Sequence, residues 1–345
     1  MNILYVGYRS GTSYHRAEAL DRLGHEVKVF SPRRNLVKKI LGLSRSCLNS
    51  WIRYTGALFL EQQFLRTLRT SPVWNENFDL VHVDDIAIAG RTFVSAIKHR
   101  FGHVSCYVID DPFGDRDGPK WRLFLDAVPE YDLISVVREP NVREAYDHGA
   151  NDVLRVYRSA DEVMHAPIDL TSEEEEEWRS EVAFIGTWFP ERGPFMERLI
   201  ERGIPLTIRG DNWKKADEWP VLEPHWAGPG VYGDDYTKAL QCAKVCLGLL
   251  SHENRDLHTQ RSLEIPYIGS LFCAERTSEH LNLYEEGREA VFWDDADECA
   301  EVCFEMLADD EQRREIAKNG RRRCIESEYT NEKVMHKILK NVVSK

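Results

Sequence analysis

Three side chains late in the sequence have types and a spacing that suit a phosphorylated ligand. Asp256, Arg261 and Glu264 lie in a short run that ends at Gly269. If this run begins a helix, Arg261 and Glu264 share a face because they are three residues apart. Backbone N–H groups and a guanidinium bind phosphate, whereas a carboxylate accepts hydrogen bonds from ribose hydroxyls. The run therefore suggests a nucleoside diphosphate site, although such pairs are also common as salt bridges on solvated helices.

The first half of the chain contains the elements of one α/β domain. Residues 3–6 and 25–30 are predicted as strands, and the helix between them carries Ala17, Leu20 and Leu23 at helical spacing before Gly24. Further strands are predicted at 80–83, 106–109 and 133–137. A strand, a helix and a second strand in this order predict a right-handed crossover in a parallel, doubly wound sheet.

A second α/β series follows a joint at 160–180, where residues 173–177 are five consecutive acids that we expect to stay solvated. Strands are predicted at 182–186, 205–210, 245–250, 271–274 and 290–293, and helices at 194–202, 297–308, 311–328 and 331–343. We therefore predict two Rossmann-like α/β domains, the first at 1–165 and the second at 166–330. A C-terminal helix at 331–345 could return to the first domain.

Composition limits the class of protein. The chain has 345 residues, 42% hydrophobic and 30% charged, which is typical of a soluble globular protein with two domains. No apolar run approaches the ~20 residues that span a bilayer, and the N-terminus reads as a strand and not as a signal peptide, so we expect a cytoplasmic protein. Most of the net charge of −13 lies in the second half, which argues against nucleic acid as a partner.

The eight cysteines show no metal-binding spacing. There is no C-x-x-C and no cluster with histidine. Cys242 and Cys246, like Cys299 and Cys303, are four residues apart and are predicted as buried helix positions. We expect a reducing compartment, no structural metal and no cofactor.

The second half resembles the group-1 glycosyltransferases, particularly the CgeB-like (spore maturation protein-like) branch. The resemblance rests on VAFIGTWFPER at 182–192, IRGDNW at 208–213, RSLEIPYIG at 261–269, YEEGREAVFW at 284–293 and the helical tail at 311–322. It covers most of 180–330, whereas the first half is similar only in style. It implies the GT-B fold, two Rossmann-like domains facing each other across a cleft. It also implies metal-independent transfer of a sugar from a nucleotide sugar, such as a UDP-sugar, to an acceptor on the first domain.

The same resemblance extends to two of the opening residues. The spacing of Asp256 and Glu264 is similar to the E-x7-E element of retaining members, with Asp in place of the first Glu. It implies that Glu264 holds the ribose, that Asp256 approaches the sugar and that retention is favoured. Arg261 would contact the diphosphate.

Further candidates for nucleotide-sugar binding follow the predicted strands of the second half. Gly186 lets backbone approach a ligand, and Arg192 would offset the charge of the leaving diphosphate. Arg209 and Gly210 end a strand, where open α/β sheets bind ligands, and Trp213 either stacks on a base or covers the core. The remaining candidates lie in loops and either contact the ligand or are ordinary loop residues: Tyr232, His252, Asn254 and His258.

Candidate catalytic residues come mainly from the first half. Gly11 begins a predicted helix that faces the cleft, and His15 on it could be a base or a phosphate contact. Asp110 and Asp111 end a predicted strand, as do Asp84 and Asp85. An inverting enzyme needs one such carboxylate or a histidine to take the acceptor's proton. Each acid could equally cap a helix or shape a turn.

Residues 31–70 form a basic segment. They contain eight arginines and lysines against the single acid Glu61, mixed with Trp51, Tyr54 and Phe59. Such a mixture suits attachment to an anionic membrane surface. It would also suit an anionic acceptor, or a helical insertion whose apolar face packs on its own domain.

Two rivals to glycosyl transfer and one variant of it remain open at this stage. A nucleotide-sugar epimerase could share the fold, and a non-catalytic protein could bind the sugar nucleotide without transfer. The variant is a glycosyltransferase that acts on DNA bases. The acidic balance of the chain argues against the last of these.

Overall fold

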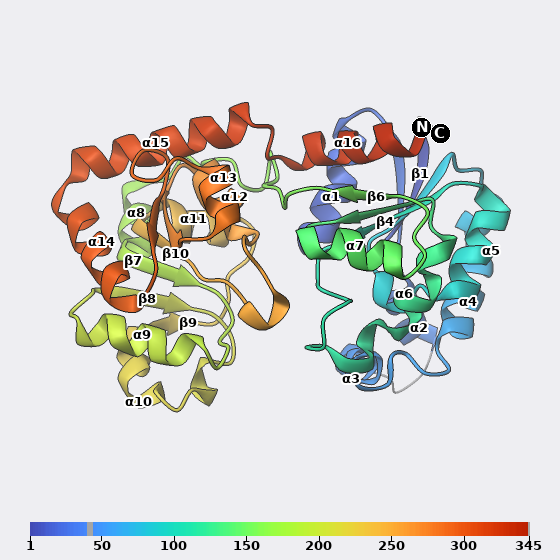
Figure 1. Cartoon of the computed structure of the whole chain (residues 1–345), viewed down its shortest axis with the longest axis horizontal. Coiled ribbons are helices and arrows are strands. Elements are labelled where there is room, and N and C mark those ends of the chain that lie inside the picture. The colour runs from blue at the N-terminus through green and yellow to red at the C-terminus, as the bar shows by residue number, and fades with distance from the viewer. Residues whose placement is uncertain (40–43, 344–345) are drawn as a thin grey trace. The chain divides into compact units, whose positions relative to one another are not determined.

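The computed structural model describes residues 1–39 and 44–343 and shows two compact units. Unit 1 comprises Met1–Tyr157, Glu253–Arg255 and Asn331–Lys345, and unit 2 comprises Arg158–His252 and Asp256–Thr330. Residues 40–43 of the basic segment lie outside the described part of the chain. Figure 1 shows that each unit is a sheet covered by helices.

Unit 1 is built on a six-stranded parallel sheet of order β2-β1-β3-β4-β5-β6. Its strands are β1 (Asn2–Val6), β2 (Glu26–Phe30), β3 (Leu80–Val83), β4 (Val104–Val108), β5 (Leu133–Val136) and β6 (Val153–Arg155). The central strands are buried along their whole length, which explains why they read as continuous apolar runs and not as alternating ones.

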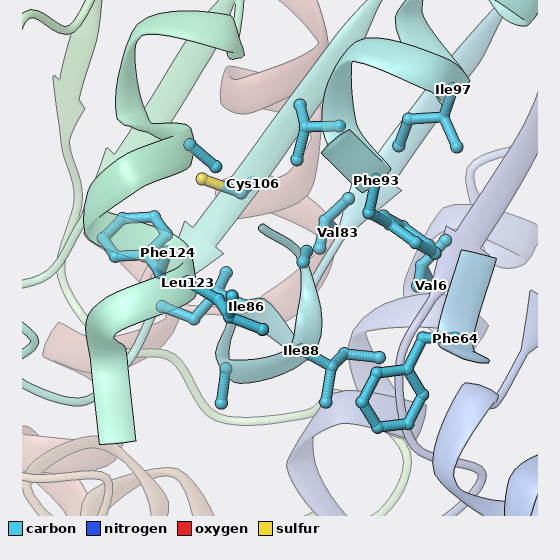
Figure 2. Packing of buried hydrophobic residues seen from close by; sticks show 14 of the residues in the cluster. Val6, Phe64, Val83, Ile86, Ile88, Phe93, Ile97, Cys106, Leu123 and Phe124 are labelled. Atoms are coloured by element: carbon cyan, nitrogen blue, oxygen red, sulfur yellow. The ribbon is translucent and has the colours of Figure 1, made fainter. Parts of the chain in front are cut away.

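Helices cover both faces of this sheet. One face packs against α2 (Pro32–Lys39), α3 (Arg45–Thr55), α4 (Glu61–Arg69), α5 (Arg91–Phe101) and α6 (Arg122–Ala127). Figure 2 shows Phe64, Phe93 and Phe124 of these helices over Val6 and Val83 of the strands. The other face packs against α1 (Gly11–Arg22) and α16 (Asn331–Val343), the last helix of the chain. The helix α7 (Glu139–Asp147) precedes β6.

Unit 2 is built on a second six-stranded parallel sheet, of order β12-β11-β10-β7-β8-β9. Its strands are β7 (Ser180–Ile185), β8 (Leu206–Arg209), β9 (Trp226–Gly228), β10 (Ala243–Gly248), β11 (Leu271–Glu275) and β12 (Val291–Trp293). Its helices are α8 (Ser172–Trp178), α9 (Arg192–Glu201), α10 (Trp219–Leu222), α11 (Asp234–Gln241), α12 (Arg261–Ile268), α13 (Ser278–Leu283), α14 (Ala296–Ala308) and α15 (Asp310–Glu326).

The two parallel sheets confirm the predicted fold class, and every predicted strand is present within a few residues. Two short edge strands, β6 and β9, have too few residues to show a pattern in the sequence. The acidic run at 173–177 is exposed but helical, because Thr171 and Glu174 form a capping box at the start of α8. The prediction that Cys242 and Cys246 are buried helix positions is wrong, since Cys242 lies just after the end of α11 and is partly exposed, and Cys246 lies in β10. No helix in the described ranges is long and apolar enough to cross a bilayer.

Candidate functional site

Arg261 lies where the sequence predicts it, at the first residue of α12. Its Nε donates a 2.6 Å hydrogen bond to the carbonyl oxygen of Ile185, the last residue of β7. Within the described part of the chain, Nη1 and Nη2 make no hydrogen bond or ion pair, and no side chain caps the first turn of α12. A guanidinium with N–H groups to spare thus lies at the positive end of a helix, although the N–H groups of Ser262 and Leu263 already donate to backbone carbonyl oxygens. The positive helix end and the guanidinium both favour an anion.

Glu264 lies one turn further along α12 and is only 5% exposed. The Tyr236 hydroxyl donates to its carboxylate at 2.5 Å, and His165 Nε2 lies 3.4 Å from the other oxygen. The ribose contact of Glu264 therefore stays a prediction, and it requires Tyr236 to share or leave this carboxylate.

Arg192 begins α9 and is almost fully buried. Its guanidinium donates to the carbonyl oxygens of Thr187, at 2.7 Å, and Leu250, at 2.8 Å. These carbonyls belong to the loops that follow β7 and β10. In this structure Arg192 holds the two loops together, and a contact with a diphosphate stays a prediction.

Gly186 and Gly210 bring two strand ends into contact. Gly210 has a φ of 155°, and a Cβ atom there would collide with the Gly186 carbonyl oxygen. Trp213 donates from its indole nitrogen to that same oxygen at 2.9 Å and is 1% exposed. Of the two roles that the sequence allows for Trp213, stacking on a base is therefore wrong, because the ring is buried in the core of unit 2.

Three other predicted residues lie at or after the carboxyl ends of strands of unit 2: Arg209 ends β8, Tyr232 follows β9 and His252 begins a short 3-10 helix after β10. Arg209 donates to the Ala227 carbonyl oxygen at 3.0 Å, and Tyr232 is 78% exposed. His252 bridges two carboxylates, with Nδ1 2.7 Å from Glu191 and Nε2 2.9 Å from Glu275. Partial burial opposes the charge on this ring, but the hydrogen bond to Glu191 and the two carboxylates raise the pKa of His252.

Asp256 and His258 have structural partners that the sequence does not reveal. Asp256 is 5% exposed and forms an ion pair with Arg158 at 3.0 Å. His258 accepts a hydrogen bond from the Arg158 backbone N–H at 3.0 Å and contacts Glu279. The charge of Asp256 is thus compensated within unit 2, and its approach to the sugar stays a prediction.

Asn254 and Asp111 belong to an ion-pair cluster in unit 1. The Asn254 side-chain oxygen accepts from the Asp111 backbone N–H at 3.3 Å. The neighbouring Arg255 binds Asp111 at 2.5 Å and Glu144 at 2.7 Å. Burial opposes ionisation of Asp111, yet hydrogen bonds from Arg255 and Asn141 lower its pKa. In this structure both side chains anchor the cluster, so the sugar contact of Asn254 and the catalytic role of Asp111 stay predictions.

Unit 1 has a cavity of about 430 Å³ at the carboxyl ends of β1, β3 and β4. Two buried ion pairs line it, Arg16 with Asp84 at 2.8 Å and Arg33 with Asp85 at 2.6 Å. The Tyr5 hydroxyl also donates to Asp84. Sequence reasoning missed the two arginines, because only the fold brings each one to a strand-end acid.

Asp110 is the predicted catalytic candidate that the cavity does expose. Its side chain is 42% exposed and lies 3.3 Å from Lys120 Nζ. His15 is half-buried on α1 and Gly11 is exposed at the start of that helix, and neither lines the cavity. Their neighbour Ser13 does, so the predicted helix start is correctly placed while the two named residues face elsewhere.

Three cysteines of unit 2 form the one group in the described residues whose geometry could hold a metal ion. Cys273 of β11 joins Cys299 and Cys303 of α14, with the sulfur atoms within 4.8 Å of one another. All three are fully buried in the core of the unit. The sequence spacing shows only the two helical members, because Cys273 comes from a strand.

Comparisons with known proteins agree with this geometry. Residues 192–340 match the glycosyl transferase-like family. The sequence has no significant match among curated proteins. Sucrose-phosphate synthase from Thermosynechococcus elongatus is similar in structure, with a TM-score of 0.67 at 13% identity over 100% of this chain and 99% of that one.

Two further solved structures contain sugar nucleotides. Anabaena Alr3699/HepE in complex with UDP-glucose has a TM-score of 0.65 at 10% identity, and all of both chains is covered. The Escherichia coli structure titled trehalose-6-phosphate, bound with UDP-2-fluoro glucose, has a TM-score of 0.63 at 11% identity and 99% coverage of both chains. These likenesses show the fold, and the family match covers much of the second half of the chain. The chain therefore has the GT-B fold of glycosyltransferases, and its residues 192–340 match the glycosyl transferase-like family.

Proposed function

We propose that the chain transfers a glycosyl group from a nucleoside-diphosphate sugar, bound by unit 2, to a hydroxyl of an acceptor, bound by unit 1. Arg261 carries the proposal, because its Nη atoms have no partner in the described chain and its Nε fixes it to the end of β7. Two adjacent N–H donors of one guanidinium match two oxygens of a diphosphate. UDP-sugars in structures of the same fold support this class of donor.

Breaking the bond between the anomeric carbon of the sugar and the diphosphate leaves negative charge on the departing nucleoside diphosphate. Arg261 and the positive end of the α12 dipole would stabilise that charge. The contribution comes from groups already fixed in position, which lowers the cost of reorganisation during the reaction. No divalent metal is needed for this task.

On the acceptor side, Asp110 is the carboxylate that we assign to the acceptor hydroxyl. It is more exposed than Asp84, Asp85 or Asp111, each of which is held by an arginine. In an inverting reaction Asp110 would take the hydroxyl proton. Retention would instead require stabilisation of the leaving group, and NMR of the anomeric proton in the first-formed product distinguishes the two outcomes.

The first test is a thermal-shift panel of UDP, GDP, ADP, CDP and dTDP with their sugars. A ligand at about 100 times its Kd stabilises the folded state by roughly 2.7 kcal/mol, which raises the Tm by several degrees. One base is expected to stand out, and its sugars are then incubated with acceptors carrying free hydroxyls.

Release of nucleoside diphosphate that depends on the acceptor supports transfer. A Tm that no nucleotide raises would contradict the donor assignment. Conversion to an isomeric sugar nucleotide without an acceptor, seen by anion-exchange chromatography, would instead identify an epimerase.

A further inference from the structure

The helix α3 of unit 1 carries an outward stripe of large apolar side chains. Trp51 and Tyr54 are 48% and 73% exposed, and the turn that follows the helix adds Leu58 at 37% and Phe59 at 82%. Cys47, one turn before Trp51, is exposed as well. Single exposed apolar residues are ordinary, but a contiguous group of this size marks an interaction site.

The base of this stripe is firmly held. Leu48 and Ile52 on the opposite face of α3 are buried in the core of unit 1. Gly56 ends the helix so close to the Pro119 backbone that a Cβ atom there would collide with the Pro119 carbonyl oxygen. Trp51 donates from its indole nitrogen to the Leu58 carbonyl oxygen at 3.0 Å, which fixes the turn to the helix. The stripe is therefore part of the folded structure.

The turn itself has an unusual backbone. Ala57 and Phe59 have φ values of 57° and 62°, in the left-handed region that residues with side chains seldom occupy. For a bulky residue this conformation costs free energy, and the surrounding structure must maintain it. With this backbone conformation the Phe59 ring lies in solvent. It is the most exposed of the large hydrophobic side chains in the described residues. Such an arrangement is understandable if Phe59 enters another apolar phase.

The charges on α3 and on the helices next in line identify that phase. Arg53 on α3 is exposed, and so are Arg34 on α2, which packs against α3, and Arg66 and Arg69 on α4, which packs against α2. Glu61, the single acid of the segment, is turned towards α5, where it accepts a hydrogen bond from the Phe93 backbone N–H at 3.0 Å. The chain as a whole carries a net charge of −13, so this concentration of cations is local. Cations next to exposed aromatic and aliphatic side chains are complementary to an anionic lipid surface.

We propose that unit 1 docks on an anionic bilayer through this surface, which we call the α3 stripe: Trp51, Tyr54, Leu58 and Phe59. The aromatic rings would lie at the headgroup level, where Trp and Tyr are favoured, while the arginines contact the anionic headgroups. The same helix lines the cavity with Asn49, Ile52 and Arg53. Docking would therefore bring the mouth of that cavity near groups carried on the lipid surface.

Vesicle co-sedimentation of the full chain tests the proposal and is independent of donor binding. We expect binding to phosphatidylcholine vesicles that contain phosphatidylglycerol, and at least about tenfold weaker binding to phosphatidylcholine alone. Tyr54→Ser with Phe59→Ser is expected to weaken binding to the anionic vesicles by at least about tenfold, because two aromatic side chains lose their burial in lipid. Both residues are exposed, so the fold should tolerate the changes. Phe304→Ser, at a 43% exposed position of unit 2, is the matched control and should bind like the wild type.

A second set of variants tests the contribution of the cations. The double variant Arg66→Glu with Arg69→Glu should bind anionic vesicles more weakly than the wild type. The control variant, Arg314→Glu on α15 of unit 2, should bind them like the wild type. Wild-type chain that does not bind anionic vesicles would overturn the proposal. A variant with Tyr54→Ser and Phe59→Ser that binds these vesicles as tightly as the wild type would also overturn it. Binding to a single-stranded oligonucleotide in place of vesicles would also overturn it, since stacked bases and phosphates would then explain the stripe.

Discussion

The strand ends of the two units hold their charged side chains in different ways. In unit 1 the carboxylates of Asp84, Asp85 and Asp111 are buried, and each is bound to an arginine. In unit 2 the Arg261 guanidinium donates to the carbonyl oxygen of Ile185, and the Arg192 guanidinium donates to the carbonyl oxygens of Thr187 and Leu250. A carbonyl orients a guanidinium without neutralising it.

This difference bears on what each unit can bind. A strand edge whose charges are already compensated suits an uncharged, hydroxyl-rich group, because there is little net charge to satisfy. A strand edge that orients a cation by carbonyl groups leaves its charge for a ligand, and an anionic diphosphate supplies the opposite charge. The comparison thus agrees with an acceptor on unit 1 and a nucleotide sugar on unit 2. It also predicts that removing a charged side chain costs stability in unit 1 and ligand affinity in unit 2.

The largest expected effect concerns Asp110, the exposed carboxylate of the unit 1 cavity. If Asp110 takes the acceptor proton, Asp110→Asn should lower the rate of transfer by about 10²–10⁴-fold. Donor affinity should not change, because unit 2 is untouched. Steady-state rates of nucleoside diphosphate release measure the effect, and Asp126→Asn on the exposed surface of α6 is the control. A rate within about threefold of the wild type would remove Asp110 from the mechanism.

The buried pair of Arg16 and Asp84 gives the second prediction. Asp84→Ala leaves the Arg16 guanidinium unpaired at 2% exposure, so unit 1 should lose about 3–5 kcal/mol of stability. Arg261→Ala in unit 2 should cost only about 0.5–1.5 kcal/mol, since it removes one hydrogen bond to a carbonyl. Hydrogen-exchange mass spectrometry reads the first loss on peptides from β1 and β3 and the second on peptides from β7. Equal losses in the two units would break the comparison.

Gly210 tests how tightly the strand ends of unit 2 are built. Gly210→Ala introduces a Cβ atom that collides with the Gly186 carbonyl oxygen, while Gly203→Ala has a positive φ but no atom within 4 Å of the new Cβ. The first change should therefore cost about 1–3 kcal/mol more than the second in the free energy of unfolding. Urea denaturation of both variants measures the difference. If both variants lose the same free energy of unfolding, the positive φ alone accounts for the requirement for glycine at 210. The close contact between Gly210 and Gly186 would then be contradicted.

The smallest effect is the titration of His252 between Glu191 and Glu275. Its pKa is raised in the folded state, so its protonated form stabilises the fold below the unfolded pKa of about 6.5. This stabilisation should be lost as the pH rises through the folded pKa. It will be small because the ring is 58% exposed. NMR titration of the ring protons should give a midpoint above 6.5, and a midpoint below it would contradict the bridge. His252→Gln should remove this pH-dependent contribution to the free energy of unfolding.

Sequence reasoning predicted the fold well because its signals are local. Apolar runs such as those at 80–83 and 271–274 mark strands buried on both faces, and the helix signals around Leu20 and Gly24 lie within a few residues of one another. The position of Arg261 at the start of a helix follows from the same kind of pattern.

The partners of the site residues could not be predicted in the same way. Asp256 is separated from Arg158 by 98 positions, and Asp111 from Arg255 by 144. Nothing local distinguishes such a compensated acid from a catalytic one, since both follow a strand or a loop. Trp213 shows the same limit, because an aromatic residue in the sequence does not reveal whether its ring is covered.

The measurement that tests the account most directly is calorimetric titration of the nucleoside diphosphate selected by the thermal-shift panel into wild-type chain and Arg261→Ala. Removing charge-assisted hydrogen bonds to the diphosphate should weaken binding by about 10–100-fold. Arg261→Lys should recover part of the loss, because a lysine keeps the charge but not the two-pronged geometry. Arg288→Ala, an exposed arginine of unit 2 paired with Glu285, should bind like the wild type. An Arg261→Ala chain that binds the nucleotide within about twofold of the wild type would contradict the assignment of unit 2 as the donor site.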